Sequence, residues 1–275
     1  MTACQLGSWI DPVSGRKFGY RLWRPVAGRR LMVIAHGFGE HGGRYTHLAE
    51  ALAAQGFWVA APDWWAHGRS GGQRGDLGDI WQAIGQLNRL TEAVFLPASG
   101  QSRYTLYGHS FGGLAAIAWA QRHPDRISRL ITQSPLIEVG FPLPHWKEAV
   151  AWTVGRCVPW ATVPLGIDLT ALCRDDTVIQ AYRRDRLVHQ QMSFRTYHAT
   201  LRMRNELLAT ARQLRVPTLL LCGDQDRLIS VKAAFVWFER LTCPKNGIIF
   251  PGGYHELHHD GLLETIVRLI GEQAE

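Results

Sequence analysis

Short apolar runs alternate with helical patterns along most of this 275-residue chain. Each run is bounded by Gly, Pro or polar residues and has the length of a strand buried on both faces. The runs are residues 31–35, 57–61, 104–107, 129–133, 217–222 and 247–250, and the helical patterns are 45–55, 79–95, 114–122, 231–240 and 257–270. This alternation predicts an α/β fold, in which a mostly parallel sheet carries helices on both faces. Residues 9–24 surround a Pro-Val-Ser-Gly turn and predict an added antiparallel hairpin.

The alternation stops between residues 136 and 213, a stretch rich in Pro, Trp and Arg. It has a helical pattern and no convincing strand. So long an excursion between two strands predicts an inserted helical cap. The expected organisation is therefore core (1–135), cap segment (136–213) and core again (214–275).

An apolar stripe at helical spacing runs through the cap segment. Two interpretations stay open: the stripe packs on the main domain, or part of it lines an apolar entrance or makes transient contact with a membrane surface. The stripe comprises Trp146, Ala149, Val150, Thr153, Val154, Cys157 and Val158, and the second interpretation adds Phe141, Trp152 and Trp160.

Composition indicates which kinds of partner and which cellular compartment to expect. The net charge of +7 comes mainly from scattered arginines, without a basic block or nucleic-acid motif, so no nucleic-acid partner is expected. The first residues lack the pattern of a signal peptide, and no apolar run approaches the ~20 residues of a membrane span. Five widely spaced cysteines without a C-x-x-C pair predict free thiols and a cytoplasmic protein.

A serine between two glycines stands at a predicted strand-to-helix junction, in Gly108-His109-Ser110-Phe111-Gly112. This is the form of a nucleophile elbow, a turn too tight for side chains at the flanking positions. It raises the serine hydroxyl above the sheet edge, and the N–H groups at the helix start face any oxyanion formed there.

Polar residues that complete such a site follow other predicted strands. In an open parallel sheet, ligand-contacting residues lie at the carboxyl ends of strands. Asp226 follows run 217–222 and His255 follows run 247–250, which gives the order Ser, Asp, His expected of an α/β-hydrolase. His255 would be the general base for Ser110, and Asp226 would orient its imidazole. The predicted oxyanion donors are the backbone N–H groups of Phe111 and Phe38.

Two other carboxylates compete for the role of the acid. Asp224 lies two residues before Asp226 and is interpreted as a turn or cap residue. Asp63 also follows a strand and is interpreted as a hydrogen-bond acceptor that orders its loop. Asp226 is favoured because the Arg-Leu-Ile run after it would place it at the loop tip.

The histidines raise the question of a metal. His255-Glu256-Leu257-His258-His259 matches the H-E-x-x-H motif of zinc metalloproteases, which needs both histidines on one helical face. Gly252 and Gly253 precede the motif and place His255 in a loop, and a zinc site would leave the elbow unexplained. His36, His41, His67 and His109 lack regular ligand spacing, so loop or substrate contacts are favoured. We expect no metal and no cofactor.

With these residues in place, the chain resembles the monoacylglycerol lipase and lysophospholipase branch of the α/β-hydrolases over almost its whole length. The resemblance rests on His36-Gly37-Phe38-Gly39-Glu40-His41 with Arg44-Tyr45, Asp63 with His67-Gly68-Arg69-Ser70, Gly108 to Gly113, Gly223 with Asp226, His255-Glu256, and in the cap Asp175-Asp176-Thr177-Val178, Tyr182, Asp185 and Leu187-Val188-His189.

The resemblance implies Ser110, Asp226 and His255 as the catalytic triad and places Arg44 and His109 near the polar head of the substrate. The chain departs from the family at Ala66, where glycine is usual, and at Phe38 and Phe111, where smaller residues or methionine are frequent. These departures affect the acyl pocket and leave the triad intact.

The expected function is a cofactor-free serine ester hydrolase that acts through an acyl-enzyme, with monoacylglycerols or similar small lipid esters as substrates. A lysophospholipase or a general aryl or alkyl carboxylesterase is the alternative. A thioesterase or amidase would use the same machinery. A binding protein without activity is the alternative from another class.

Overall fold

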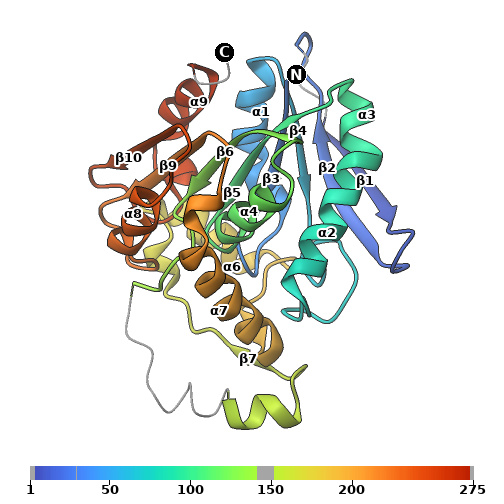
Figure 1. The fold of residues 1–275 in the computed structure, drawn as a ribbon, viewed down its shortest axis with the longest axis vertical. Coiled ribbons are helices and arrows are strands. Elements are labelled where there is room, and N and C mark those ends of the chain that lie inside the picture. Colours follow the sequence, from blue (N-terminus) through green and yellow to red (C-terminus); the bar gives the residue numbers. More distant parts are fainter. Residues whose placement is uncertain (1–3, 29, 141–151, 273–275) are drawn as a thin grey trace.

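An eight-stranded sheet forms the centre of the computed structural model, which describes residues 4–28, 30–140 and 152–272 (Figure 1). From β4 to β10 all neighbouring strands are parallel, whereas β2 is antiparallel to both β1 and β4. The spatial order is β1 (Cys4–Ile10), β2 (Lys17–Trp23), β4 (Phe57–Pro62), β3 (Arg30–Ala35), β5 (Tyr104–His109), β6 (Ile127–Gln133), β9 (Thr218–Gly223) and β10 (Lys245–Phe250). The predicted mostly parallel sheet and the added hairpin are confirmed.

Helices cover both faces of this sheet, and the sheet divides the core into two clusters. Successive residues of β3 point to opposite faces, so Val33 packs in one core cluster and Ile34 in the other, both fully buried. The first cluster includes residues of α2 (Ile80–Leu90), α4 (Phe111–Arg122) and α8 (Val231–Glu239). The second includes residues of α1 (Thr46–Ala54) and α9 (Leu263–Glu272). A short 3₁₀ turn, η1 (Gly42–Tyr45), leads into α1. Burial on both faces explains why the strands read as continuous apolar runs.

Two predicted helices are interrupted. The pattern at 79–95 is α2 followed by a π-helical turn η2 (Thr91–Phe95), and the chain continues as α3 (Leu96–Ser99). The pattern at 257–270 is a short 3₁₀ turn η5 (Leu257–His259) followed by α9. Gly261, with φ of +76°, separates η5 from α9, because a left-handed residue cannot continue the helix.

The cap segment lies at one end of the sheet, where Figure 1 shows α6, α7 and β7. Its elements are β7 (Thr162–Pro164), η3 (Leu169–Ala171), α6 (Asp176–Arg184), β8 (Gln191–Ser193), α7 (Phe194–Ala209) and η4 (Ala211–Gln213). The prediction of no strand in this segment was wrong, because β7 and β8 pair antiparallel. One side of α7 joins the main core through Met203 and Leu207, which anchors the cap segment to that core.

Part of the apolar stripe lies outside the described residues, namely Trp146, Ala149 and Val150, as does Phe141. Trp152 contacts the His198 ring and is still 56% exposed, and Val154 and Cys157 are exposed as well. Packing on the main domain therefore does not describe Val154 and Cys157, which belong to the stripe.

The five cysteines, all within the described residues, are free thiols, as predicted. In the same part of the chain, no helix has both the length and the apolar character that crossing a bilayer requires.

Candidate active site

Ser110 occupies a strained turn between β5 and α4. Its backbone has φ of 54° and ψ of −120°, which is rare for a residue with a Cβ, and its N–H donates to the Gln133 carbonyl at 3.0 Å. The flanking glycines are required by close packing. A Cβ on Gly108 would lie 2.6 Å from the Ala116 Cβ, and one on Gly112 would collide with the carbonyl oxygen of Ala35. The predicted elbow is thus the local conformation that the structure shows.

His255 and Asp226 form a buried hydrogen-bonded pair at the neighbouring strand ends. His255 Nδ1 lies 2.8 Å from Asp226 Oδ2, and the two side chains are 4% and 0% exposed. The other carboxylate oxygen of Asp226 accepts the N–H groups of Leu228 and Ile229 at 2.9 and 3.0 Å. These bonds fix the carboxylate and leave it ready to hold the imidazole in one orientation.

The two competing carboxylates have other partners. Asp224 accepts the N–H of Gly252 at 2.7 Å in an exposed loop. Asp63 accepts the N–H groups of Gly42 and Arg69, each at 2.8 Å, which agrees with the loop-ordering interpretation. Asp226 is the carboxylate that contacts His255.

Contact between His255 and Asp226 also shifts the pKa of each residue. Burial disfavours a charged imidazole, but the adjacent Asp226 carboxylate outweighs it and raises the pKa of His255 above the ordinary value. Burial likewise disfavours the charged carboxylate, and His255 and the two N–H donors nevertheless lower the pKa of Asp226. The arrangement therefore stabilises an imidazolium next to a carboxylate, the state that forms when a histidine takes a proton from a serine.

Phe38 and Phe111, the predicted oxyanion donors, line the same cavity as Ser110. Phe111 is the first residue of α4, where the helix leaves the N–H without an internal partner. Phe38 lies in the loop after β3, next to Gly37, whose own N–H donates to Glu40 at 2.6 Å. The rings of Phe38 and Phe111 meet edge to face, with centroids 5.5 Å apart, so both residues stand on the same wall of the site.

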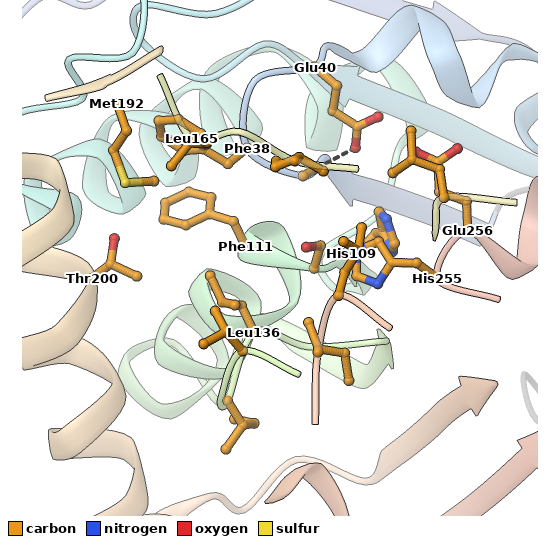
Figure 2. A pocket seen from close by; sticks show the side chains of 18 of the residues that line it. Phe38, Glu40, His109, Phe111, Leu136, Leu165, Met192, Thr200, His255 and Glu256 are labelled. Carbon is orange, nitrogen blue, oxygen red and sulfur yellow. Dashed lines mark hydrogen bonds between the residues drawn. The ribbon is translucent and has the colours of Figure 1, made fainter. Parts of the chain in front are cut away.

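One cavity of about 480 Å³ is lined by Ser110 and His255 together with Phe38 and Phe111. Figure 2 shows His109, His255, Glu40 and Glu256 toward one end and Phe111, Leu165, Met192 and Thr200 toward the other. Apolar side chains from the core and from the cap segment form most of the wall, namely Phe38, Phe111, Leu136, Ile137, Leu165, Ile167, Leu172, Met192, Leu201, Leu228 and Ile229.

The polar end is organised around Arg44. Its guanidinium donates to Glu256 at 2.5 and 2.7 Å and to Glu40 at 2.6 Å, and the Tyr182 ring lies 4.6 Å from it. Burial disfavours every charge in this group, yet the carboxylates raise the pKa of Arg44 and the guanidinium lowers the pKa of Glu256. Two ionised carboxylates therefore share one cation at the end of the cavity.

Arg44 and His109, which the resemblance places near the polar head of the substrate, both line the cavity. Their contact with the substrate stays a prediction. The His109 ring lies at a tilt against the His255 ring, with centroids 4.7 Å apart, and Gln133 Nε2 lies 3.1 Å from His109 Nδ1. Burial, and then the neighbouring His255, lowers the pKa of His109 to about 4, so His109 is neutral beside the base.

Glu40, Glu256 and Tyr182 were not predicted as site residues. Glu40 is four residues before Arg44, a spacing that indicates an ion pair on a helical turn. Glu256 lies 212 residues from Arg44 in sequence, and no local pattern reveals that contact.

The H-E-x-x-H motif lacks the zinc-protease arrangement. His255 precedes η5 and His259 ends it, so the two histidines do not share a face of an α-helix. Among the described residues, the group whose ligand atoms come close enough for a metal is Glu256, His258 and His259, which leaves out His255. The Glu256 carboxylate in that group already accepts hydrogen bonds from the Arg44 guanidinium. Its Oε2 also lies 2.8 Å from His259 Nδ1.

The sheet order and the strand-end placement of serine, histidine and aspartate define the class: an α/β-hydrolase. The chain belongs, over residues 27–261, to the family described as "Serine aminopeptidase, S33". A monoacylglycerol lipase of Mycolicibacterium smegmatis is 31% identical over 251 residues, 90% of this chain and 89% of that protein. The monoglyceride lipase of Homo sapiens is 29% identical, over 87% of this chain and 80% of that protein. The crystal structure of Paleococcus ferrophilus monoacylglycerol lipase has a TM-score of 0.84 and 30% identity, over 94% of this chain and 97% of that one.

These similarities confirm three predictions: the α/β-hydrolase fold, the resemblance to the monoacylglycerol lipase branch, and an enzyme of the hydrolase class.

Proposed function

We propose that this protein hydrolyses small lipid esters, foremost monoacylglycerols, through an acyl-enzyme on Ser110. One observation carries the proposal: Ser110, on its strained elbow, lines the same cavity as His255, whose Nδ1 is held 2.8 Å from Asp226. The similarity to monoacylglycerol lipases supports the choice of substrate.

The mechanism follows from these positions. Ser110 Oγ attacks the ester carbonyl while His255 takes its proton, and the carbonyl electrons move onto the oxygen. The N–H groups of Phe38 and Phe111 stabilise that oxyanion. As it collapses, the C–O bond to the alcohol breaks and His255 returns the proton to the leaving alcohol. Water then attacks the acyl-enzyme by the same steps, which releases the fatty acid and restores Ser110.

The residues that line the cavity favour a substrate with an uncharged head group. Its apolar wall suits a hydrocarbon chain, and its polar end places two ionised carboxylates, Glu40 and Glu256, beside the single cation Arg44. Hydroxyl groups of glycerol can donate to carboxylates, whereas the phosphate of a lysophospholipid would meet like charge. Like-charge contacts at a binding site cost several kcal/mol.

The experiment is one panel of substrates with matched acyl chains: glyceryl, lysophosphatidylglycerol and p-nitrophenyl esters, with the corresponding thioester and amide. Lysophosphatidylglycerol is chosen because its head group carries the phosphate charge without a compensating cation. We expect kcat/KM for the glyceryl ester to exceed that for the lysophospholipid by at least about tenfold, because of the charge contact above. Comparable or faster hydrolysis of the lysophospholipid would contradict the assignment of the head group. Faster cleavage of the amide would favour a peptidase, as the family description suggests.

We infer a division into core (1–135), cap (136–213) and core (214–275), with catalysis that needs no metal or cofactor. Transient contact of the cap with a lipid surface is supported by Trp152 and Trp160, which are 56% and 52% exposed. The free cysteines support a cytoplasmic location.

A further inference from the structure

The loop that carries Phe38 is held from two sides. We call residues 36–41, which follow β3, the oxyanion loop. From within the loop, the Glu40 carboxylate accepts the N–H of Gly37 at 2.6 Å. From the cap segment, the N–H of His189 donates to the Gly39 carbonyl at 2.8 Å. The residues on either side of Phe38 are thus fixed by different parts of the chain.

A second cap contact holds the end of the same loop. His41 Nε2 lies 2.8 Å from Asp185 Oδ2, although the two residues are 144 positions apart. His41 Nδ1 accepts the N–H of Gly43 at 3.0 Å, so the neutral ring carries its proton on Nε2 and donates it to Asp185. The other oxygen of Asp185 accepts the N–H of Leu187 at 2.8 Å, which orders the turn that leads to His189.

The packing around Gly39 leaves little freedom in this region. Gly39 has φ of +79°, and a Cβ there would collide with the carbonyl oxygen of His189. The ring of Phe38 also meets the His189 ring edge to face, with centroids 5.8 Å apart. The cap segment therefore contacts the loop at Phe38, Gly39 and His41.

We propose that the Asp185–His41 contact is a positioning device: through it the cap segment sets the direction of the Phe38 N–H. An oxyanion donor lowers the barrier only if it already points at the developing charge, so its loop must be held before the reaction. Asp185 and His41 are then positioning residues that act on the transition state through Phe38. This inference rests on the proposed serine mechanism.

Two variants test the contact from opposite sides. Asp185→Ala removes the carboxylate, and His41→Asn shortens the side chain beyond reach of Asp185 while it keeps an acceptor for the Gly43 N–H. We expect each to lower kcat by about 10- to 100-fold, less than the 10²–10³ that loss of a whole oxyanion donor costs. The double variant should lose little more than either single one, because both break the same contact. Asp185→Asn, which keeps an amide oxygen for His41, should recover part of the rate.

A transition-state analogue separates positioning from general damage. A trifluoromethyl ketone with an alkyl chain accepts Ser110 Oγ and places an oxyanion at Phe38, so its Ki should rise by the same factor as kcat/KM falls. The Kd of a monoalkyl glycerol ether, which binds without forming an oxyanion, should change by less than about threefold.

Asp76→Ala is the matched control, because Asp76 also joins core and cap, through Arg195 and Ser193, but does not contact the oxyanion loop. It should lower the melting temperature at least as much as Asp185→Ala, since Asp76 is the more buried carboxylate, and leave the Ki of the ketone unchanged.

An unchanged Ki in Asp185→Ala and His41→Asn would overturn the proposal, as would an equal rise of Ki in Asp76→Ala. An inactive wild-type protein that the ketone does not inhibit would instead overturn the proposed function.

Discussion

Replacing Ser110 by alanine is expected to lower kcat for p-nitrophenyl ester hydrolysis by about 10⁴-fold or more, because the nucleophile is lost while the binding cavity stays. Alanine has the same Cβ as serine, so the φ of 54° is no harder to hold. The melting temperature should therefore change by no more than a few degrees. Initial rates and a thermal melt by circular dichroism measure the two quantities on one sample.

Ser134 offers a matched control for this substitution. It is buried, has a positive φ of 46°, and follows β6 at the same edge of the sheet, but its hydroxyl has no hydrogen-bond partner in the described structure. Ser134→Ala should retain the wild-type rate within a factor of about two, as expected for a site outside the chemistry. Hydrolysis that survives Ser110→Ala would contradict the serine mechanism.

The second large effect concerns the acid. Asp226→Asn is expected to lower kcat by about 10⁴-fold, because an amide cannot stabilise the imidazolium and favours the wrong tautomer of His255. Asp224→Asn should lower it less than tenfold, since among the described contacts the Asp224 carboxylate bonds only to the backbone of the loop after β10.

The pH dependence of kcat/KM tests the assignment of Asp226 as the acid independently. The base works when His255 is neutral, so kcat/KM falls as the pH drops through its pKa. Because Asp226 raises that pKa, the acidic limb of the wild type should lie above about 6.5, the ordinary value for histidine. The limb should move to lower pH in Asp226→Asn and stay in place in Asp224→Asn. A larger loss of rate, or a shifted limb, in Asp224→Asn would assign the acid to Asp224 instead.

Much of the fold could be predicted because its signals are local. Strands buried on both faces leave unbroken apolar runs, and the elbow requires glycines at fixed offsets from Ser110, where a Cβ would collide with its neighbours. The strand ends then place Asp226 and His255 near Ser110 without any knowledge of side-chain contacts.

What could not be predicted depends on short elements and distant contacts. Strands β7 and β8 have three residues each, too few for a period-two pattern. The break before α9 depends on a single left-handed glycine, Gly261. The pairing of Arg44 with Glu256, and of His41 with Asp185, joins residues far apart in sequence, so only the folded chain reveals it.

The most direct test of the acyl-enzyme mechanism is the mass of the protein after reaction with an alkyl fluorophosphonate. The reagent should add one phosphonyl group with loss of fluoride, and peptide mapping should place it on Ser110, with no addition to Ser110→Ala. The rate of addition should fall as the pH drops through the raised pKa of His255. A protein that hydrolyses esters without such an adduct, or that carries it on another residue, would contradict the proposed role of Ser110.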